Sequence, residues 1–285
     1  MQIPLWILVG LAAAVFIGGQ TAYQKYALAS MDSIQVAFYT NLFAIPPLLA
    51  FALYSGITFD TDVLLPLGLS ITVNIAGAVL IVTALNYDDV GVIGSFRSFV
   101  PIGVAVIEPL VFAGEMYVLL TFAASVTAMA GTYVLLVEDS YTAPLRRISE
   151  TGPQLALISA AGYSAAFVFD RVALSTSSVS PSVYPVFLTC GVAAGLGIYL
   201  TWRDGLENII TITRTGVFLG TLRAGVLVFA ILNLTLTTAA NASIIVQFGN
   251  LVALGLGYVF FDEEYIGWRL AGGLILMLSV GLAVL

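Results

Sequence analysis

The sequence contains no histidine and a single cysteine, Cys190. Zinc and haem sites that depend on histidine are therefore excluded, and so are Ser–His catalytic triads. One cysteine can form neither an intramolecular disulfide nor a cysteine metal cluster. We accordingly expect no metal site, no cofactor and no enzyme activity.

Charged residues are also scarce. They make up 9% of the 285 residues, whereas a soluble domain carries roughly 25%. Nine Lys and Arg against sixteen Asp and Glu leave a net charge of −7, which argues against a nucleic-acid partner. Hydrophobic residues reach 60%, and the mean hydropathy is +1.06. A soluble globule could not cover this much apolar surface, so the composition predicts a polytopic membrane protein, in the cell membrane of a prokaryote.

The hydrophobic residues form ten runs of about 20 residues, the length that one membrane helix requires. Lipid-facing β-barrels need strict alternation of polar and apolar residues, and these runs are apolar throughout. We therefore predict an all-α protein with ten transmembrane helices, the second bent at Pro46–Pro47. They cover residues 3–23, 34–54, 63–85, 91–112, 117–137, 154–174, 181–202, 215–236, 242–261 and 265–285.

The two halves of the chain look duplicated. A shift of 148 residues places Gly114–Tyr117 on Asp262–Tyr265, and a shift of 146 places Gln24–Leu28 on Asp170–Leu174. We predict a first five-helix repeat at residues 1–137, a polar connecting loop at 138–152 and a second repeat at 153–285. Because five is an odd number, the second repeat must be inverted in the membrane, an arrangement typical of secondary transporters.

Four segments carry a resemblance to a known family: Gly18–Leu28, Pro101–Glu115, Ala239–Ser243 and Asp262–Glu263. The chain resembles the ten-helix EamA-type transporters of the drug/metabolite transporter superfamily. This resemblance implies a membrane carrier, often an exporter of amino acids or other small metabolites, with both termini in the cytoplasm. The positive-inside rule favours the opposite orientation, so both remain open. Glu108 and Arg97 depart from the family pattern, and Asp262 stands where glycine is commoner.

Glu108 is the strongest candidate for a functional residue inside the membrane. An ionisable side chain in hydrocarbon costs roughly 3 kcal/mol on insertion scales, so such residues usually face a cavity. Glu108 is either a proton-coupling or amine-binding group, or an interfacial carboxylate near a helix end. Arg97 lies on the same helical face and either holds a substrate carboxylate or anchors the helix in the headgroups. Pro101, between them, is the predicted helix bend, which an ordinary packing kink would also explain.

Further polar residues inside the predicted helices are candidates for a substrate cavity. Amides also bond helix to helix, so a packing role is the alternative. For Lys25 and Arg171 we favour snorkelling to the headgroups, with Asp170 neutralising its neighbour. The remaining cavity candidates are Gln20, Gln24, Tyr39, Asn74, Tyr163, Asp170, Asn241 and Gln247.

We interpret the chain as a carrier that moves a small polar or amphipathic metabolite by alternating access. An amino acid-like substrate and export are the first expectation, and proton coupling through Glu108 and facilitated diffusion are both open. A lipid-headgroup flippase and an uncoupled facilitator or channel are the alternatives. Small-residue stripes such as Gly191 with Gly195 indicate close packing within the bundle first and dimerisation second, so the protein is either a monomer or a homodimer.

Overall fold

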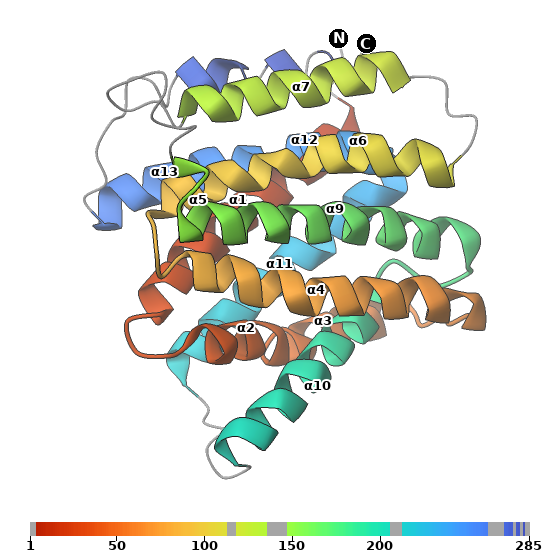
Figure 1. The fold of residues 1–285 in the computed structure, drawn as a ribbon. Coiled ribbons are helices and arrows are strands. Elements are labelled where there is room, and N and C mark those ends of the chain that lie inside the picture. Colours follow the sequence, from red (N-terminus) through yellow and green to blue (C-terminus); the bar gives the residue numbers. More distant parts are fainter. Residues whose placement is uncertain are drawn as a thin grey trace.

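The computed structural model describes residues 4–112, 118–135, 147–205, 213–261 and 271–275, and residues 278, 279 and 282. Within these residues all regular secondary structure is helical (Figure 1). The α-helices are α1 Leu5–Ala27, α2 Ser33–Leu42, α3 Ile45–Ser55, α4 Leu64–Ala84, α5 Val90–Phe96, α6 Val100–Val111, α7 Val118–Leu135, α9 Thr151–Thr176, α10 Tyr184–Asp204, α11 Arg214–Leu236, α12 Ala239–Ile245 and α13 Phe248–Phe261. The structure also has two short 3-10 helices, η1 Thr61–Val63 and η2 Arg97–Phe99.

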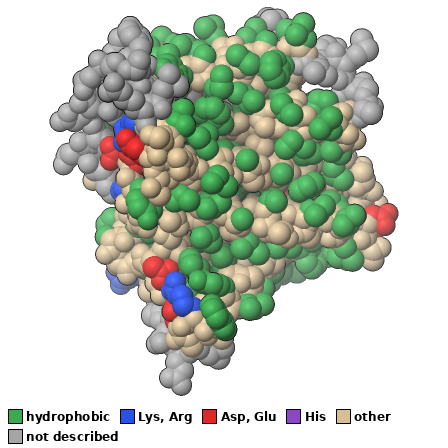
Figure 2. Space-filling view, in the orientation of Figure 1, with side chains coloured by type: hydrophobic (Ala, Val, Ile, Leu, Met, Phe, Trp, Pro, Cys, Tyr) green, Lys and Arg blue, Asp and Glu red, His purple; other side chains and the backbone are tan. Residues whose placement is uncertain are grey.

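The helices have the length and composition of membrane spans. Seven segments of the described chain are long and apolar enough to cross a membrane, and two shorter apolar helices accompany them. Figure 2 shows a face that is largely hydrophobic between edges where charged side chains gather. The chain is therefore an integral membrane protein. Nine of the ten predicted runs coincide with described helices. Most of the run at 265–285 lies outside the described residues, as do segments 114–117 and 262–265 and most of the predicted loop at 138–152.

Three of the predicted spans are interrupted. The run at 34–54 breaks between α2 and α3, and Pro46 and Pro47 lie in the first turn of α3, as the predicted bend requires. The run at 91–112 breaks at η2, directly before the first turn of α6, which contains Pro101. A proline in the first turn needs no backbone hydrogen bond, so Pro101 starts α6 rather than kinking a continuous helix. The run at 242–261 breaks between α12 and α13.

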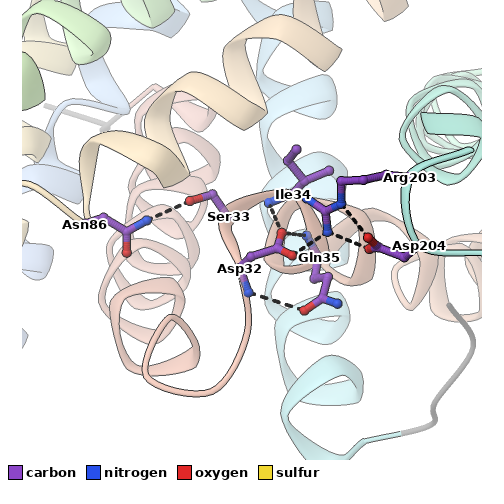
Figure 3. Close-up of polar contacts among 7 residues, drawn as sticks. All are labelled: Asp32, Ser33, Ile34, Gln35, Asn86, Arg203 and Asp204. Carbon is purple, nitrogen blue, oxygen red and sulfur yellow. Dashed lines mark hydrogen bonds and ion pairs between the residues drawn. The ribbon is translucent and has the colours of Figure 1, made fainter. Parts of the chain in front are cut away.

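Polar contacts tie several helix ends together on one side of the bundle. Figure 3 shows Arg203, at the end of α10, reaching Asp32, which caps the start of α2; Asn86, just after α4, donates to Ser33 over 2.8 Å. The Lys25 ammonium, in the last turn of α1, donates to the carbonyl oxygens of Leu85 at 2.5 Å and Asp88 at 2.8 Å. The ends of α1, α4 and α10 therefore share this side with the start of α2. Lys25 therefore donates hydrogen bonds to backbone carbonyls that follow α4. These contacts were not predicted when Lys25 was interpreted as a headgroup anchor.

Other contacts define the opposite side and the direction of α9. Arg147, which precedes α9, pairs with Asp88 on the first side. Beyond the far end of α9, the backbone N–H of Ser178 donates to the Asp60 carboxylate over 2.9 Å. Helix α9 thus starts on the side where α1 ends. The two helices therefore run in opposite directions.

Glycines allow the closest helix contacts inside the bundle. A Cβ added at Gly191 of α10 would lie 2.3 Å from Ile71 Cδ1 of α4, and one at Gly195 would lie 2.5 Å from Ile75 Cδ1. A larger residue at either position would require the facing isoleucine side chain or the helix to shift. The contacts confirm that this stripe of small residues packs within the bundle.

Candidate functional site

A cavity of about 80 Å³ lies in the middle of the bundle, between α1, α4, α9, α10 and α11 and the breaks in the two interrupted spans at 91–112 and 242–261. A buried water needs roughly 10–15 Å³ on this measure, so the cavity has room for several waters or a small solute. Apolar side chains such as Val100, Phe167 and Leu227 form much of the wall. The polar and charged residues that line it are Asn74, Arg97, Tyr163, Asp170, Arg223, Gln247 and Asn250.

Five of the predicted cavity residues line this space: Asn74, Arg97, Tyr163, Asp170 and Gln247. The structure does not place the other five on its wall. They are Glu108, Gln20, Gln24, Tyr39 and Asn241.

Gln24, Tyr39 and Asn241 are among the five residues that are not on the cavity wall. Gln24 is buried in the last turn of α1. The Tyr39 ring lies between Phe38 and Phe43, with ring-centre distances of 5.5 and 5.8 Å. Asn241 Nδ2 donates to Thr237 Oγ1 over 3.3 Å at the start of α12. Their helices direct them to neighbours other than the cavity.

Two arginines face the cavity from different helices. Arg97 stands in η2, where Nη1 donates to Thr21 Oγ1 over 3.2 Å and the guanidinium lies 5.4 Å from the centre of the Tyr163 ring. Arg223 stands in the middle of α11, and its buried Nε has no hydrogen-bond partner among the residues that the structure describes. Among the described residues neither arginine forms an ion pair. The cavity therefore contains two cationic groups whose charges are not neutralised by direct contact.

Asp170 supplies the negative charge of the cavity. Its Oδ1 accepts hydrogen bonds from Ser70 Oγ at 2.5 Å and from Tyr184 OH at 2.6 Å. Both donors bind the same oxygen, and no hydrogen bond to Oδ2 is found among the described residues. The interpretation of Asp170 as a partner for Arg171 is therefore wrong, because its carboxylate turns inward to α4 and α10.

Glu108 forms a separate polar cluster outside the cavity wall. One carboxylate oxygen pairs with Arg171 Nη1 and accepts the backbone N–H of Ala239 at 2.8 Å, and the other accepts that of Ala240 at 2.9 Å. The Arg171 guanidinium also lies 4.9 Å from the centre of the Phe112 ring. Glu108 thus joins α6, α9 and the start of α12. The expectation that Arg171 anchors in the headgroups is wrong, since its charge is paired inside the protein.

The two helix breaks beside the cavity are related by the proposed duplication. The shift of 148 residues places Ser98 and Phe99, in η2, on Val246 and Gln247, between α12 and α13. Both breaks contribute to the cavity wall, through Arg97 on one side and through Val246 and Gln247 on the other. A membrane helix interrupted at the midplane is stable only beside protein or a polar cavity, where its free backbone groups find partners.

Arg223 is the functional candidate that our reading of the sequence missed. It is the only charged residue in the apolar run at 215–236, so the signal was present in the sequence. The same argument that singles out Glu108, the cost of a charge in hydrocarbon, applies to it with equal force. Asn250 also lines the cavity, where its Nδ2 donates to Gln247 Oε1 over 2.9 Å.

The helices and the buried, charged cavity define a polytopic membrane protein with an internal polar site. Residues 4–137 match the model of the EamA-like transporter family, which confirms the resemblance over this part of the chain and indicates a transporter of small molecules. No curated protein matches the sequence. A solved structure, described only as a crystal structure of a protein, has the same fold. Its TM-score is 0.74 at 14% identity, over 99% of this chain and 98% of that chain.

Proposed function

We propose that the protein is a secondary carrier that exports a small polar or amphipathic metabolite, amino acid-like in size and polarity, by alternating access. The observation that carries this proposal is the central cavity, which gathers charged and amide side chains where two related spans are interrupted. Many secondary transporters bind substrate at the midplane, between inverted repeats and beside broken helices. The opposite directions of α1 and α9 and the matching positions of the breaks support two inverted five-helix repeats, at 1–137 and 153–285.

The Glu108 cluster closes one end of the pathway in this proposal. A second pocket of about 460 Å³ lies beside it, lined by residues of α9, by the end of α11 and by the connection from α11 to α12. Leu234 lines both this pocket and the central cavity, so only a short barrier separates them. Because Glu108 joins α6, α9 and α12, breaking its contacts would free these helices to separate at this end.

We propose that Glu108 couples transport to protons through the contacts of this cluster. A protonated Glu108 loses its ionic attraction to Arg171 and keeps weaker hydrogen bonds to α12. Protonation would therefore favour opening at this end, and deprotonation would favour closure. In this scheme Glu108 controls access, while Arg97, Arg223 and Asp170 face the solute.

Counterflow in proteoliposomes tests the function directly. Vesicles preloaded with pooled amino acids and small metabolites are expected to show saturable exchange of one compound class. Currents beyond carrier rates would instead indicate a channel, and exchange of labelled lipids between leaflets would indicate a flippase. Folded protein without any exchange would refute the carrier.

Coupling is tested with an imposed pH gradient. Glu108→Gln is expected to retain counterflow but to lose accumulation driven by the gradient. Glu150→Gln is the matched control, because the Glu150 side chain is 53% exposed and lies outside the cluster. Undiminished coupling in the Glu108→Gln variant would refute this role.

A further inference from the structure

We propose that the solute bound in the central cavity carries a single carboxylate, held by Arg97 and Arg223. This inference rests on the proposed function, since it names the chemistry of the transported compound. It is more specific than the general expectation of an amino acid-like metabolite, because it assigns Arg97 and Arg223 to the carboxylate of the solute. Arg223 was not among the candidates identified from the sequence.

Among the described residues, neither arginine of the cavity forms an ion pair. Arg97 has one hydrogen bond to a neutral hydroxyl, and the buried Nε of Arg223 has no partner. Both arginines line the same cavity. Asp170 lines the same cavity and supplies one negative charge for two cations, so one uncompensated positive charge favours an anion there. A guanidinium is the side chain best suited to a carboxylate, because its parallel N–H groups match the two oxygens.

The charge balance of the cavity narrows the class of anion. Two arginines and Asp170 leave one positive charge, which a monoanion neutralises. A phosphate dianion would leave a net negative charge beside the Asp170 carboxylate. The apolar wall at Val100, Phe167 and Leu227 fits the hydrocarbon part of a small acid rather than a second charged group. The dianionic form of inorganic phosphate is therefore disfavoured, and the apolar wall disfavours its monoanion.

Asp170 can distinguish two kinds of carboxylate compound. Within the described residues both of its hydrogen bonds end on Oδ1, so Oδ2 is available to an ammonium group bound in the cavity that Asp170 lines. An α-amino acid would use Oδ2 as well as the arginines and would leave one positive charge in the cavity. A simple acid would use the arginines alone and would neutralise the cavity. The carboxylate is common to both.

A binding experiment on the purified, detergent-solubilised protein separates this inference from transport. The probes are propionate, L-alanine, n-propylamine and inorganic phosphate, and the readouts are thermal stabilisation and equilibrium binding. We expect at least one of the two carboxylates to bind, and n-propylamine and phosphate not to bind. Arg97→Gln and Arg223→Gln are each expected to weaken carboxylate binding at least tenfold. Arg214→Gln is the matched control, because Arg214 lies exposed at the start of the same helix, away from the cavity, and should leave binding unchanged.

The possible results lead to different conclusions. Binding of L-alanine without propionate, reduced further by Asp170→Asn, would identify an amino acid site; equal binding would identify a site for simple acids. Binding of n-propylamine or phosphate in preference to both carboxylates, or no binding of either carboxylate, would overturn the inference. If Arg223→Gln does not fold, Arg223→Lys keeps the charge without the paired N–H groups and should still weaken binding. Carboxylate binding without counterflow would refute the carrier function but support the carboxylate site. Counterflow of amines or uncharged solutes would support the carrier function but refute the carboxylate site.

Discussion

The ion pair between Glu108 and Arg171 provides a quantitative test of the structure. The Glu108 side chain is 7% exposed and that of Arg171 is 15% exposed, so each charge is largely removed from water. Removing one partner of a buried ion pair costs about 3–5 kcal/mol, mostly because the other charge is left uncompensated. Glutamine at position 108 still offers one carbonyl oxygen to the N–H groups of Ala239 and Ala240. We therefore expect Glu108→Gln to cost about 3 kcal/mol, at the lower end of that range.

The double variant tests whether the loss comes from the pair itself. Arg171→Gln alone should also cost about 3 kcal/mol, because it leaves the Glu108 carboxylate buried without its cation. If the two effects were independent, the double variant would lose about 6 kcal/mol. Since the double variant contains neither buried charge, we expect it to lose about 3 kcal/mol, which corresponds to a coupling energy of about 3 kcal/mol.

Unfolding by SDS titration in mixed micelles measures these free energies, with helix content followed by circular dichroism. The pair formed by Asp32 and Arg203 is the control, because their side chains are 42% and 31% exposed. Asp32→Asn retains a capping side chain, and the coupling in this exposed pair should stay below about 1 kcal/mol. A Glu108–Arg171 coupling below about 0.5 kcal/mol would refute the buried ion pair.

Three further predictions concern packing and the helix ends. Gly220→Ala should cost about 3 kcal/mol, because its Cβ would lie 2.2 Å from the Phe43 backbone carbon, whereas Gly68→Ala meets nothing within 4 Å and should not destabilise the protein; thermal unfolding in detergent compares them. Lys25→Met should cost about 2 kcal/mol in the same assay, since two carbonyls lose a charged donor, and an unchanged melting temperature would contradict this. The backbone N–H of Ser178 holds the pKa of Asp60 below its ordinary value of 3.8, so this carboxylate stabilises the fold above that pH and the contribution is lost on further acidification. Acidification from about pH 5 to about pH 3 should therefore lower the melting temperature more in the wild type than in Asp60→Asn, and equal shifts would argue against the contact.

Much of the architecture could be predicted from local properties of the sequence. Hydrophobic run length places the spans, because every backbone group in lipid must be satisfied within a helix. Proline positions locate two of the breaks, since Pro46 with Pro47 and Pro101 each suit a first helical turn. The break at Val246 and Gln247 has no proline, and only its relation to η2 through the duplication points to it.

The polar partners could not be predicted in the same way. Asp170 and Arg171 are neighbours in the chain but point in different directions, one to Ser70 and Tyr184 and the other to Glu108. Adjacent residues on a helix are separated by about 100° around its axis, so sequence proximity does not make them partners. The assumption that adjacent opposite charges neutralise each other failed for this reason.

The sequence by itself determined that the protein is helical, lies in a membrane and contains charges that hydrocarbon would not tolerate. These properties depend on composition and on the periodicity of single segments. Only the tertiary structure decided which charges meet, because Arg97, Asp170 and Arg223 come from three helices far apart in the chain and share one cavity. The same holds for Glu108, which is not on the wall of that cavity and is paired with Arg171 and the start of α12. Partner choice depends on helix rotation and on the crossing of distant segments, and these are fixed by packing across the whole bundle.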